Sequence, residues 1–154
     1  MSVAFRRESD DEHLEPKFEL PIPPGPNLVT PRGRALIEAQ VVALEAALAA
    51  TPDAEAAKPI ARDLRYWKTR RATAIDTAPR GDGVVGFGSR VRFALAGKER
   101  EVTLVGDDEA DPPAGLLSFS APLARALMGA EAGEFVAFNG REDAIEVLEV
   151  GAAG

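Results

Sequence analysis

The sequence predicts an α+β protein in which an antiparallel helical hairpin precedes a small antiparallel sheet that covers one short helix. Between residues 28 and 79 apolar side chains recur every three or four positions, the spacing of amphipathic helices. From residue 89 onward apolar and polar side chains alternate, which is typical of strands with one buried face. We therefore predict three segments: a tail over 1–27, the hairpin over 28–79 and a C-terminal domain over 80–154.

Composition limits the functions open to this chain. Its 154 residues carry a net charge of −7, and the tail and C-terminal segments are both acidic. Tight non-specific binding to naked nucleic acid, which needs clustered Lys and Arg, is therefore disfavoured. The lack of cysteine excludes disulfides and thiolate metal ligands and fits a reducing compartment. No apolar run approaches the ~20 residues of a membrane span. We expect a monomeric cytoplasmic protein with no membrane partner.

The tail over 1–27 is predicted to be flexible. Charged residues crowd positions 6–15, and five prolines follow, which favour an extended backbone without apolar periodicity. Phe18, Leu20 and Ile22 alternate, so a short strand docked on the rest of the protein stays open as an alternative.

The hairpin begins at a clear helix start. Thr30 can accept hydrogen bonds from the free amides of the first turn, and Pro31 suits the first helical position. The first helix then places apolar residues at Leu36 or Ile37, Val41, Leu44 and Leu48. After a break at 51–53, the second helix places them at Ile60, Leu64, Trp67 and Ile75. Because each stripe is too narrow to be stable alone, the two arms, each about 30 Å long, should pack antiparallel.

The C-terminal segment reads as strands around one helix. Strands are expected over 89–95, 101–105, 116–120, 134–138 and 144–150, with a helix over 122–128 closed by Gly129. Asn139-Gly140 separates the last two strands and tolerates the positive φ that a tight hairpin turn needs.

Several stretches of this segment resemble the C-terminal domain of the bacterial Gre transcription elongation factors, the GreA/GreB family. They are Val105-Gly106-Asp107-Asp108-Glu109-Ala110-Asp111 with Gly115 and Ser118, then Pro122-Leu123-Ala124-Arg125-Ala126-Leu127-Met128-Gly129, and upstream Val85-Gly86-Phe87-Gly88-Ser89-Arg90-Val91. Leu28-Val29-Thr30-Pro31-Arg32-Gly33 followed by Leu36 is similar to the start of the family's coiled coil. The chain thus resembles a short-hairpin variant of the family.

The resemblance implies a coiled-coil hairpin followed by an FKBP-like domain, and a regulator with no enzymatic activity or cofactor of its own. In the family, the C-terminal domain binds core RNA polymerase near its secondary channel. The coiled coil enters the channel, near the nascent RNA and DNA, and carboxylates at its tip help to hold the catalytic Mg²⁺ of the polymerase during transcript cleavage. Carried over to this sequence, the docking region comprises Asp107, Asp108, Glu109, Asp111, Pro122 and Arg125.

The tip departs from the family pattern where cleavage activity resides. Aligned on Tyr66, the stretch from Lys58 has no acidic residue at the essential positions. Asp53 and Glu55 at the turn are candidate substitutes, but acids in a first helical turn also stabilise the helix N-terminus through its dipole. The shorter hairpin favours a regulator with weak or no cleavage stimulation over a cleavage factor.

A second departure concerns the helix over 122–128. Ala121 stands where the family favours Ser, so either Ser120 caps this helix or the cap is lost, at a cost of about 1 kcal/mol.

Basic residues recur every three positions along the second helix, at Arg62, Arg65 and Lys68, and Arg71 extends the run. They are interpreted either as channel-facing groups that meet acidic walls or transcript phosphates, or as an ordinary solvated face.

Two other classes of function stay open. An FKBP-like fold suggests a peptidyl-prolyl isomerase. The active site of such an enzyme requires an aromatic-lined pocket, however, and phenylalanines are the only aromatic residues in the C-terminal segment. The other class is an interaction module unrelated to transcription. A metal site is not expected, because His13 is the single histidine and no cysteine accompanies it.

Overall fold

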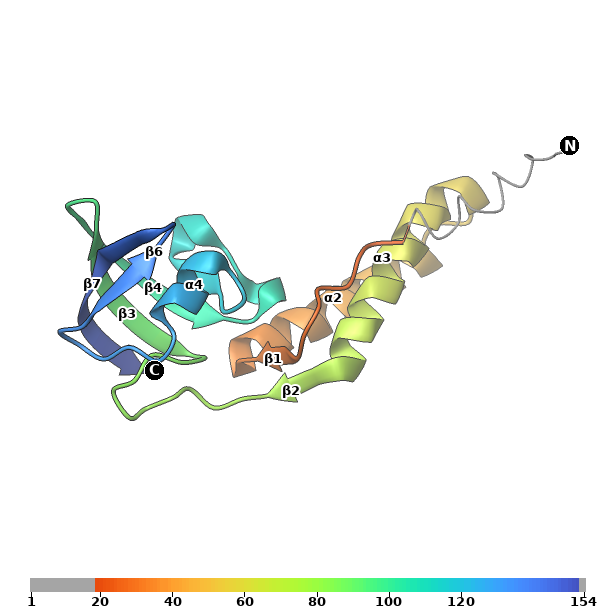
Figure 1. Cartoon of the computed structure of the whole chain (residues 1–154). Coiled ribbons are helices and arrows are strands. Elements are labelled where there is room, and N and C mark those ends of the chain that lie inside the picture. The colour runs from red at the N-terminus through yellow and green to blue at the C-terminus, as the bar shows by residue number, and fades with distance from the viewer. Residues whose placement is uncertain (1–18, 153–154) are drawn as a thin grey trace, which may run out of the picture. The chain divides into compact units, whose positions relative to one another are not determined.

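The computed structural model describes residues 19–152, so His13 and most of the predicted tail lie outside the described residues (Figure 1). The chain forms two compact units built from discontinuous stretches. The first unit contains residues up to Gly25 together with Ile37–Ala72, and the second contains Pro26–Leu36 together with Thr73–Gly154. The division cuts through the first helix, so the first turn of that helix belongs to the same unit as the C-terminal sheet.

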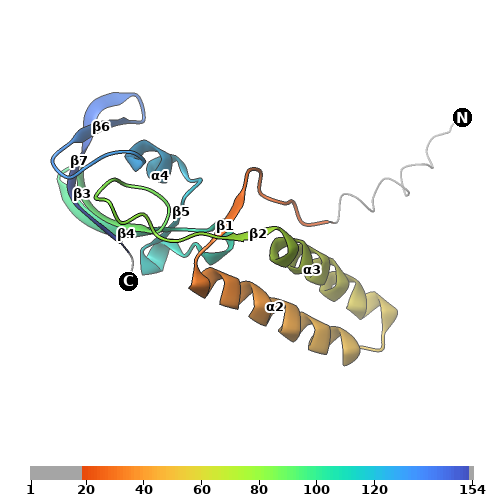
Figure 2. The ribbon, with the colours of Figure 1, turned by 90° about the horizontal axis from the view of Figure 1, so that it is seen from below.

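The first unit contains most of two antiparallel helices, α2 (Pro31–Ala49) and α3 (Ala54–Thr73), which lie side by side in Figure 2. Ion pairs at 3.8 Å connect Glu45 to Lys68 and Glu38 to Arg71, as an antiparallel pair requires. The predicted apolar stripes are confirmed at three of their positions, because Ile37, Val41 and Leu64 are buried.

Helix α3 ends earlier than predicted. Ile75 was expected to be an apolar helix position, but it lies in strand β2 (Ala74–Asp76) and is 49% exposed. Strand β2 pairs in parallel with β1 (Asn27–Val29). The docked strand considered at Phe18, Leu20 and Ile22 does not form in the described part of the tail, because residues 19–26 contain no strand; Phe18 lies outside the described residues. Both strands are three residues long, which is too short for an alternating apolar pattern to identify them in the sequence. The paired residues also lie more than 40 positions apart, so no local pattern predicts their pairing.

A five-stranded sheet in the order β5-β4-β3-β7-β6 forms the centre of the second unit. Its strands are β3 (Ser89–Leu95), β4 (Lys98–Val105), β5 (Leu116–Ser118), β6 (Phe135–Phe138) and β7 (Arg141–Ala152). The predicted turn is confirmed, because Asn139 and Gly140 adopt φ of 53° and 77° between β6 and β7. The sheet is mixed rather than wholly antiparallel: two short 3-10 helices, η1 (Asp107–Glu109) and η2 (Pro112–Ala114), return the chain so that β5 runs parallel to β4.

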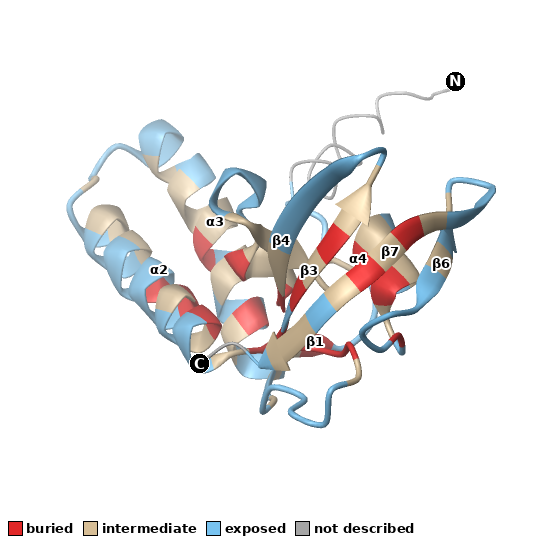
Figure 3. Ribbon diagram, turned by 90° about the vertical axis from the view of Figure 1, so that its left-hand side faces the viewer, coloured by how far each residue is buried: buried red, intermediate tan, exposed pale blue. Residues whose placement is uncertain are grey.

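One face of this sheet packs with the short helix α4 (Pro122–Leu127) around the core. The buried residues, red in Figure 3, are Val85, Val91, Phe93, Leu104, Ala124, Leu127, Ala130, Ile145 and Val147. The opposite face carries cross-strand ion pairs, such as Arg90 with Glu101 at 3.2 Å and Arg92 with Glu99 at 3.1 Å. This arrangement confirms the α+β class.

Helix α4 begins without a side-chain cap. Ala121 occupies the cap position and makes no side-chain capping hydrogen bond. The hydroxyl of Ser120 bonds to Asp107 instead. Of the two possibilities in the sequence, the structure shows the lost cap.

Within residues 19–152, no helix combines the length and the apolar character needed to cross a lipid bilayer.

Candidate functional site

Asp107 connects the two parts of the predicted docking region. Its carboxylate accepts hydrogen bonds from the hydroxyls of Ser118, at 2.5 Å, and Ser120, at 2.7 Å. Ser120 lies two residues before Pro122, the first residue of α4. The acidic loop at η1 is therefore fixed against the turn that enters α4.

The side chains that this arrangement presents carry both signs of charge. Asp111, Pro122 and Arg125 are exposed, whereas Asp107 and Asp108 are partly buried. Acidic residues come from the η1–η2 loop and the basic residue comes from α4. Such a mixed surface can select a partner through the placement of its charges.

Glu109 is placed differently from the other residues of the predicted docking region. It is only 6% exposed, and its carboxylate accepts hydrogen bonds from the Thr30 hydroxyl at 2.5 Å and from Arg32 at 3.1 Å. This side chain therefore presents little surface to a partner. The structure therefore places Glu109 against the N-terminus of α2. Sequence reasoning missed this contact because Thr30 lies 79 positions from Glu109.

The candidate tip carboxylates have local partners. Asp53 accepts the backbone N–H of Ala56 at 2.9 Å and so caps α3, while Glu55 forms an ion pair with Lys58 at 3.1 Å. These contacts fit the helix-start interpretation. Among the described residues, no group of three or more His, Cys, Asp or Glu side chains could hold a metal ion.

Each predicted channel-facing basic residue pairs with a carboxylate of the same unit. Arg62 pairs with Asp63 at 3.0 Å, Lys68 pairs with Glu45 at 3.8 Å, and Arg65 pairs with Glu19. These partly exposed pairs contribute little stability. The carboxylates nevertheless offset the positive charge of the basic face that was predicted from the spacing of these residues along α3.

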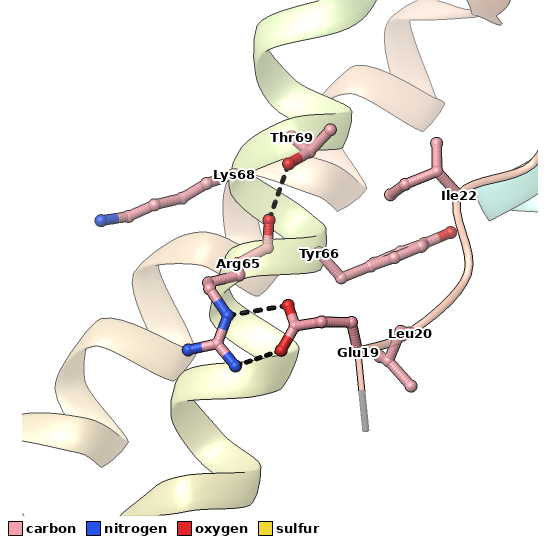
Figure 4. Close-up of a pocket in the computed structure, with 7 residues that line it drawn as sticks. All are labelled: Glu19, Leu20, Ile22, Arg65, Tyr66, Lys68 and Thr69. Atoms are coloured by element: carbon pink, nitrogen blue, oxygen red, sulfur yellow. Dashed lines mark hydrogen bonds and ion pairs between the residues drawn. The ribbon is translucent and has the colours of Figure 1, made fainter. Parts of the chain in front are cut away.

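The Arg65–Glu19 pair belongs to a surface pocket that sequence reasoning missed. Residues 19–22, here called the N-terminal strap, lie along α3 and form the pocket with it (Figure 4). The lining residues are Glu19, Leu20, Ile22, Arg65, Tyr66, Lys68 and Thr69. The pKa of the Glu19 carboxyl is lowered, chiefly because it accepts hydrogen bonds from Arg65. The one local signal was the alternation of Leu20 and Ile22 beside an acidic residue.

Comparison with known proteins connects this geometry to a family. Residues 80–152 match the family model "Transcription elongation factor, GreA/GreB, C-term". The chain is 41% identical over 86 residues to the transcription elongation factor GreA of Rhizobium etli (strain CIAT 652), which covers 53% of this chain and 54% of that protein. It is 40% identical over 84 residues to GreA of Sinorhizobium medicae (strain WSM419), which covers 52% and 53% of the two chains. The chain thus matches about half the length of these relatives.

Solved structures similar to this one include GreA/GreB from Nitrosomonas europaea, at 21% identity and a TM-score of 0.38, with 83% of this chain and 99% of that chain covered. Gfh1 of Thermus aquaticus is 17% identical with a TM-score of 0.39, and 82% of this chain and 99% of that chain are covered. The residues that match the family model include the η1 loop, the Asp107 link and α4. Residues 80–152 are thus similar to the C-terminal domain of the GreA/GreB transcription elongation factors, the likeness that the sequence resemblance predicted.

Proposed function

We propose that this protein is a cytoplasmic, monomeric regulator of transcription elongation that binds core RNA polymerase at its secondary channel. The observation that carries the proposal is the Asp107 link, which joins the acidic loop to the entry of α4 inside the matched domain. The proposed docking surface consists of Asp107, Asp108, Asp111, Pro122 and Arg125.

In this proposal the helical hairpin enters the secondary channel and alters elongation by the polymerase, and the protein catalyses no reaction itself. Asp53 caps α3 and Glu55 pairs with Lys58, so neither carboxylate is set apart for a metal ion. Any Mg²⁺ would come from the polymerase active site, and contact with nascent RNA or DNA would be indirect, within the elongation complex. These features favour a regulator that occupies the channel with weak or no stimulation of cleavage.

Binding to core polymerase tests the docking surface. Asp111→Lys and Arg125→Glu reverse exposed charges on the two elements, and each should weaken binding at least about tenfold if these charges meet complementary ones. Glu142→Lys makes the same acid-to-base change at the exposed start of β7 and should leave the affinity unchanged. Failure of the unmodified protein to bind core polymerase at low ionic strength would overturn the proposal.

The role of the hairpin can be tested separately. A photoreactive residue at position 55 within a polymerase complex should cross-link at the channel mouth if the protein blocks entry. Attachment beside the catalytic centre would instead support a cleavage-type role.

The packing of three phenylalanines in the described second unit gives no support to the isomerase alternative. Phe87 and Phe93 are buried, and Phe87 packs edge-to-face against Phe119 with ring centroids 5.5 Å apart. These rings are used in packing rather than arranged around an open pocket. Peptidyl-prolyl isomerisation above the uncatalysed rate would revive the alternative.

A further inference from the structure

The N-terminal strap is held on α3 by a two-point polar contact. The Glu19 carboxylate accepts hydrogen bonds from both Nε and a terminal nitrogen of Arg65, at 2.8 and 2.5 Å. Arg65 pairs with a carboxylate in the planar, bidentate geometry that guanidinium groups favour. The contact joins residues 46 positions apart in sequence.

Apolar residues continue the contact along the helix. Leu20 and Ile22 follow Glu19 and line the same pocket as Tyr66, and in Figure 4 the Tyr66 ring extends toward them while Lys68 points to the other side of the helix. Leu20 and Ile22 keep exposures of 36% and 46%. The strap therefore rests on the surface as an extended acidic–apolar peptide and is not part of a core.

We propose that the α3 face formed by Arg65, Tyr66 and Thr69 is a binding site for an acidic–apolar peptide segment, and that the strap occupies it in competition with an acidic surface of a protein partner. The partner offers the same chemistry as the strap: a carboxylate for Arg65 and apolar side chains beside Tyr66. This inference rests on the proposed function for the identity of the partner, the polymerase, but not for the strap contact itself.

The strength of the contact suits an exchangeable occupant. The side chains of Arg65 and Glu19 are 56% and 43% exposed, so solvent screens their attraction and the pair is weak. The strap is nevertheless part of the same chain, which gives it an effective concentration in the millimolar range for a short linker. The ion pair together with the apolar contacts of Leu20 and Ile22 holds the strap in place, and a stronger acidic ligand can displace it.

The chain offers a direct probe of this site. Tyr66 is its single tyrosine, so incorporation of 3-fluorotyrosine gives one ¹⁹F resonance from inside the pocket of the full-length protein. Glu19→Gln should shift that resonance, and raising the salt concentration should move the unmodified protein toward the same position. Glu99→Gln is a matched control, because Glu99 is an exposed carboxylate paired with Arg92 on the sheet. Coincident spectra for Glu19→Gln and the unmodified protein would overturn the strap contact.

Affinity for core polymerase tests the competition. Glu19→Gln should bind about two- to fivefold more tightly, the effect of removing one exposed ion pair from the competing state, and Glu99→Gln should not change the affinity. Equal affinities for Glu19→Gln and the unmodified protein would overturn the competition. If Glu19→Gln instead binds single-stranded RNA more tightly than the unmodified protein does, with no gain in affinity for polymerase, the proposal that the site binds an acidic peptide segment would be overturned. If the unmodified protein does not bind polymerase, the proposed function fails while the fluorine spectra still decide the strap contact.

Discussion

The Thr30 hydroxyl donates a 2.5 Å hydrogen bond to Glu109 while it accepts the backbone N–H of Gly33 at 2.9 Å. One side chain thereby caps α2 and connects its first turn to the η1 loop. Gly33 makes room for this contact, because a Cβ there would lie 2.9 Å from a Glu109 oxygen. The start of the helical hairpin is therefore stabilised by the sheet unit, to which residues 26–36 belong.

Glu109→Ala should lower the free energy of unfolding by about 1–3 kcal/mol, because the partly buried Thr30 hydroxyl and the Arg32 guanidinium lose hydrogen bonds to a charged acceptor. Glu109→Gln should cost less, since its amide oxygen can still accept from Thr30. Denaturant unfolding followed by circular dichroism measures both. Glu142→Ala, at an exposed site, should stay within about 0.5 kcal/mol of the unmodified protein. A Glu109→Ala variant as stable as this control would contradict the assigned role.

Gly106→Ala should destabilise the second unit. A Cβ at position 106 would lie 2.3 Å from the backbone oxygen of Leu28 in β1, and backbone cannot move aside as a flexible side chain can. We expect a loss of about 1–3 kcal/mol, typical of overpacking. Gly81→Ala is the control, because a Cβ at position 81 would meet no atom within 4 Å, and this substitution should be neutral or slightly stabilising. Equal thermal midpoints for the two variants would exclude the close approach.

Ala121→Ser should stabilise the protein. The backbone at Ala121 is extended, as a helix cap requires, but no side chain caps α4. A serine hydroxyl could accept a free amide of the first turn and contribute roughly 0.5–1 kcal/mol. The measurement is the denaturant midpoint, and a midpoint below that of the unmodified protein would show that the partly buried site rejects the hydroxyl.

The features that the sequence predicted are those specified by neighbouring residues. Helical spacing located Ile37, Val41 and Leu64, and Asn139-Gly140 specified its turn through its own backbone preferences. The features it missed depend on distant partners: Thr30 meets Glu109 across 79 positions and Glu19 meets Arg65 across 46. The parallel β4–β5 pair is missed for the same reason, since register between strands joined by η1 and η2 is fixed by the packed unit rather than by local periodicity.

The strap contact should depend on pH through Glu19. Its pKa is lowered in the bound strap, chiefly by the hydrogen bonds from Arg65, so the ionised carboxylate stabilises the bound state above the ordinary glutamate pKa of about 4.3. That contribution is lost as the pH falls through the lowered pKa. The ¹⁹F resonance of Tyr66 should therefore be constant between about pH 7 and 5 and move toward the Glu19→Gln position below about pH 4. A Glu19→Gln protein that shows the same pH response would assign the transition to another group.

Asp53 allows helix capping to be separated from any action on a metal ion. Its carboxylate accepts the Ala56 N–H at the start of α3, and Asn caps a helix about as well as Asp but offers a neutral amide oxygen to a metal. Asp53→Asn should keep the stability of the protein, whereas Asp53→Ala should lose about 1 kcal/mol. If Asp53 acts only as a cap, transcript cleavage by a backtracked polymerase complex should be the same with Asp53→Asn as with the unmodified protein. Reduced cleavage with Asp53→Asn at unchanged stability would show that the charge acts inside the channel.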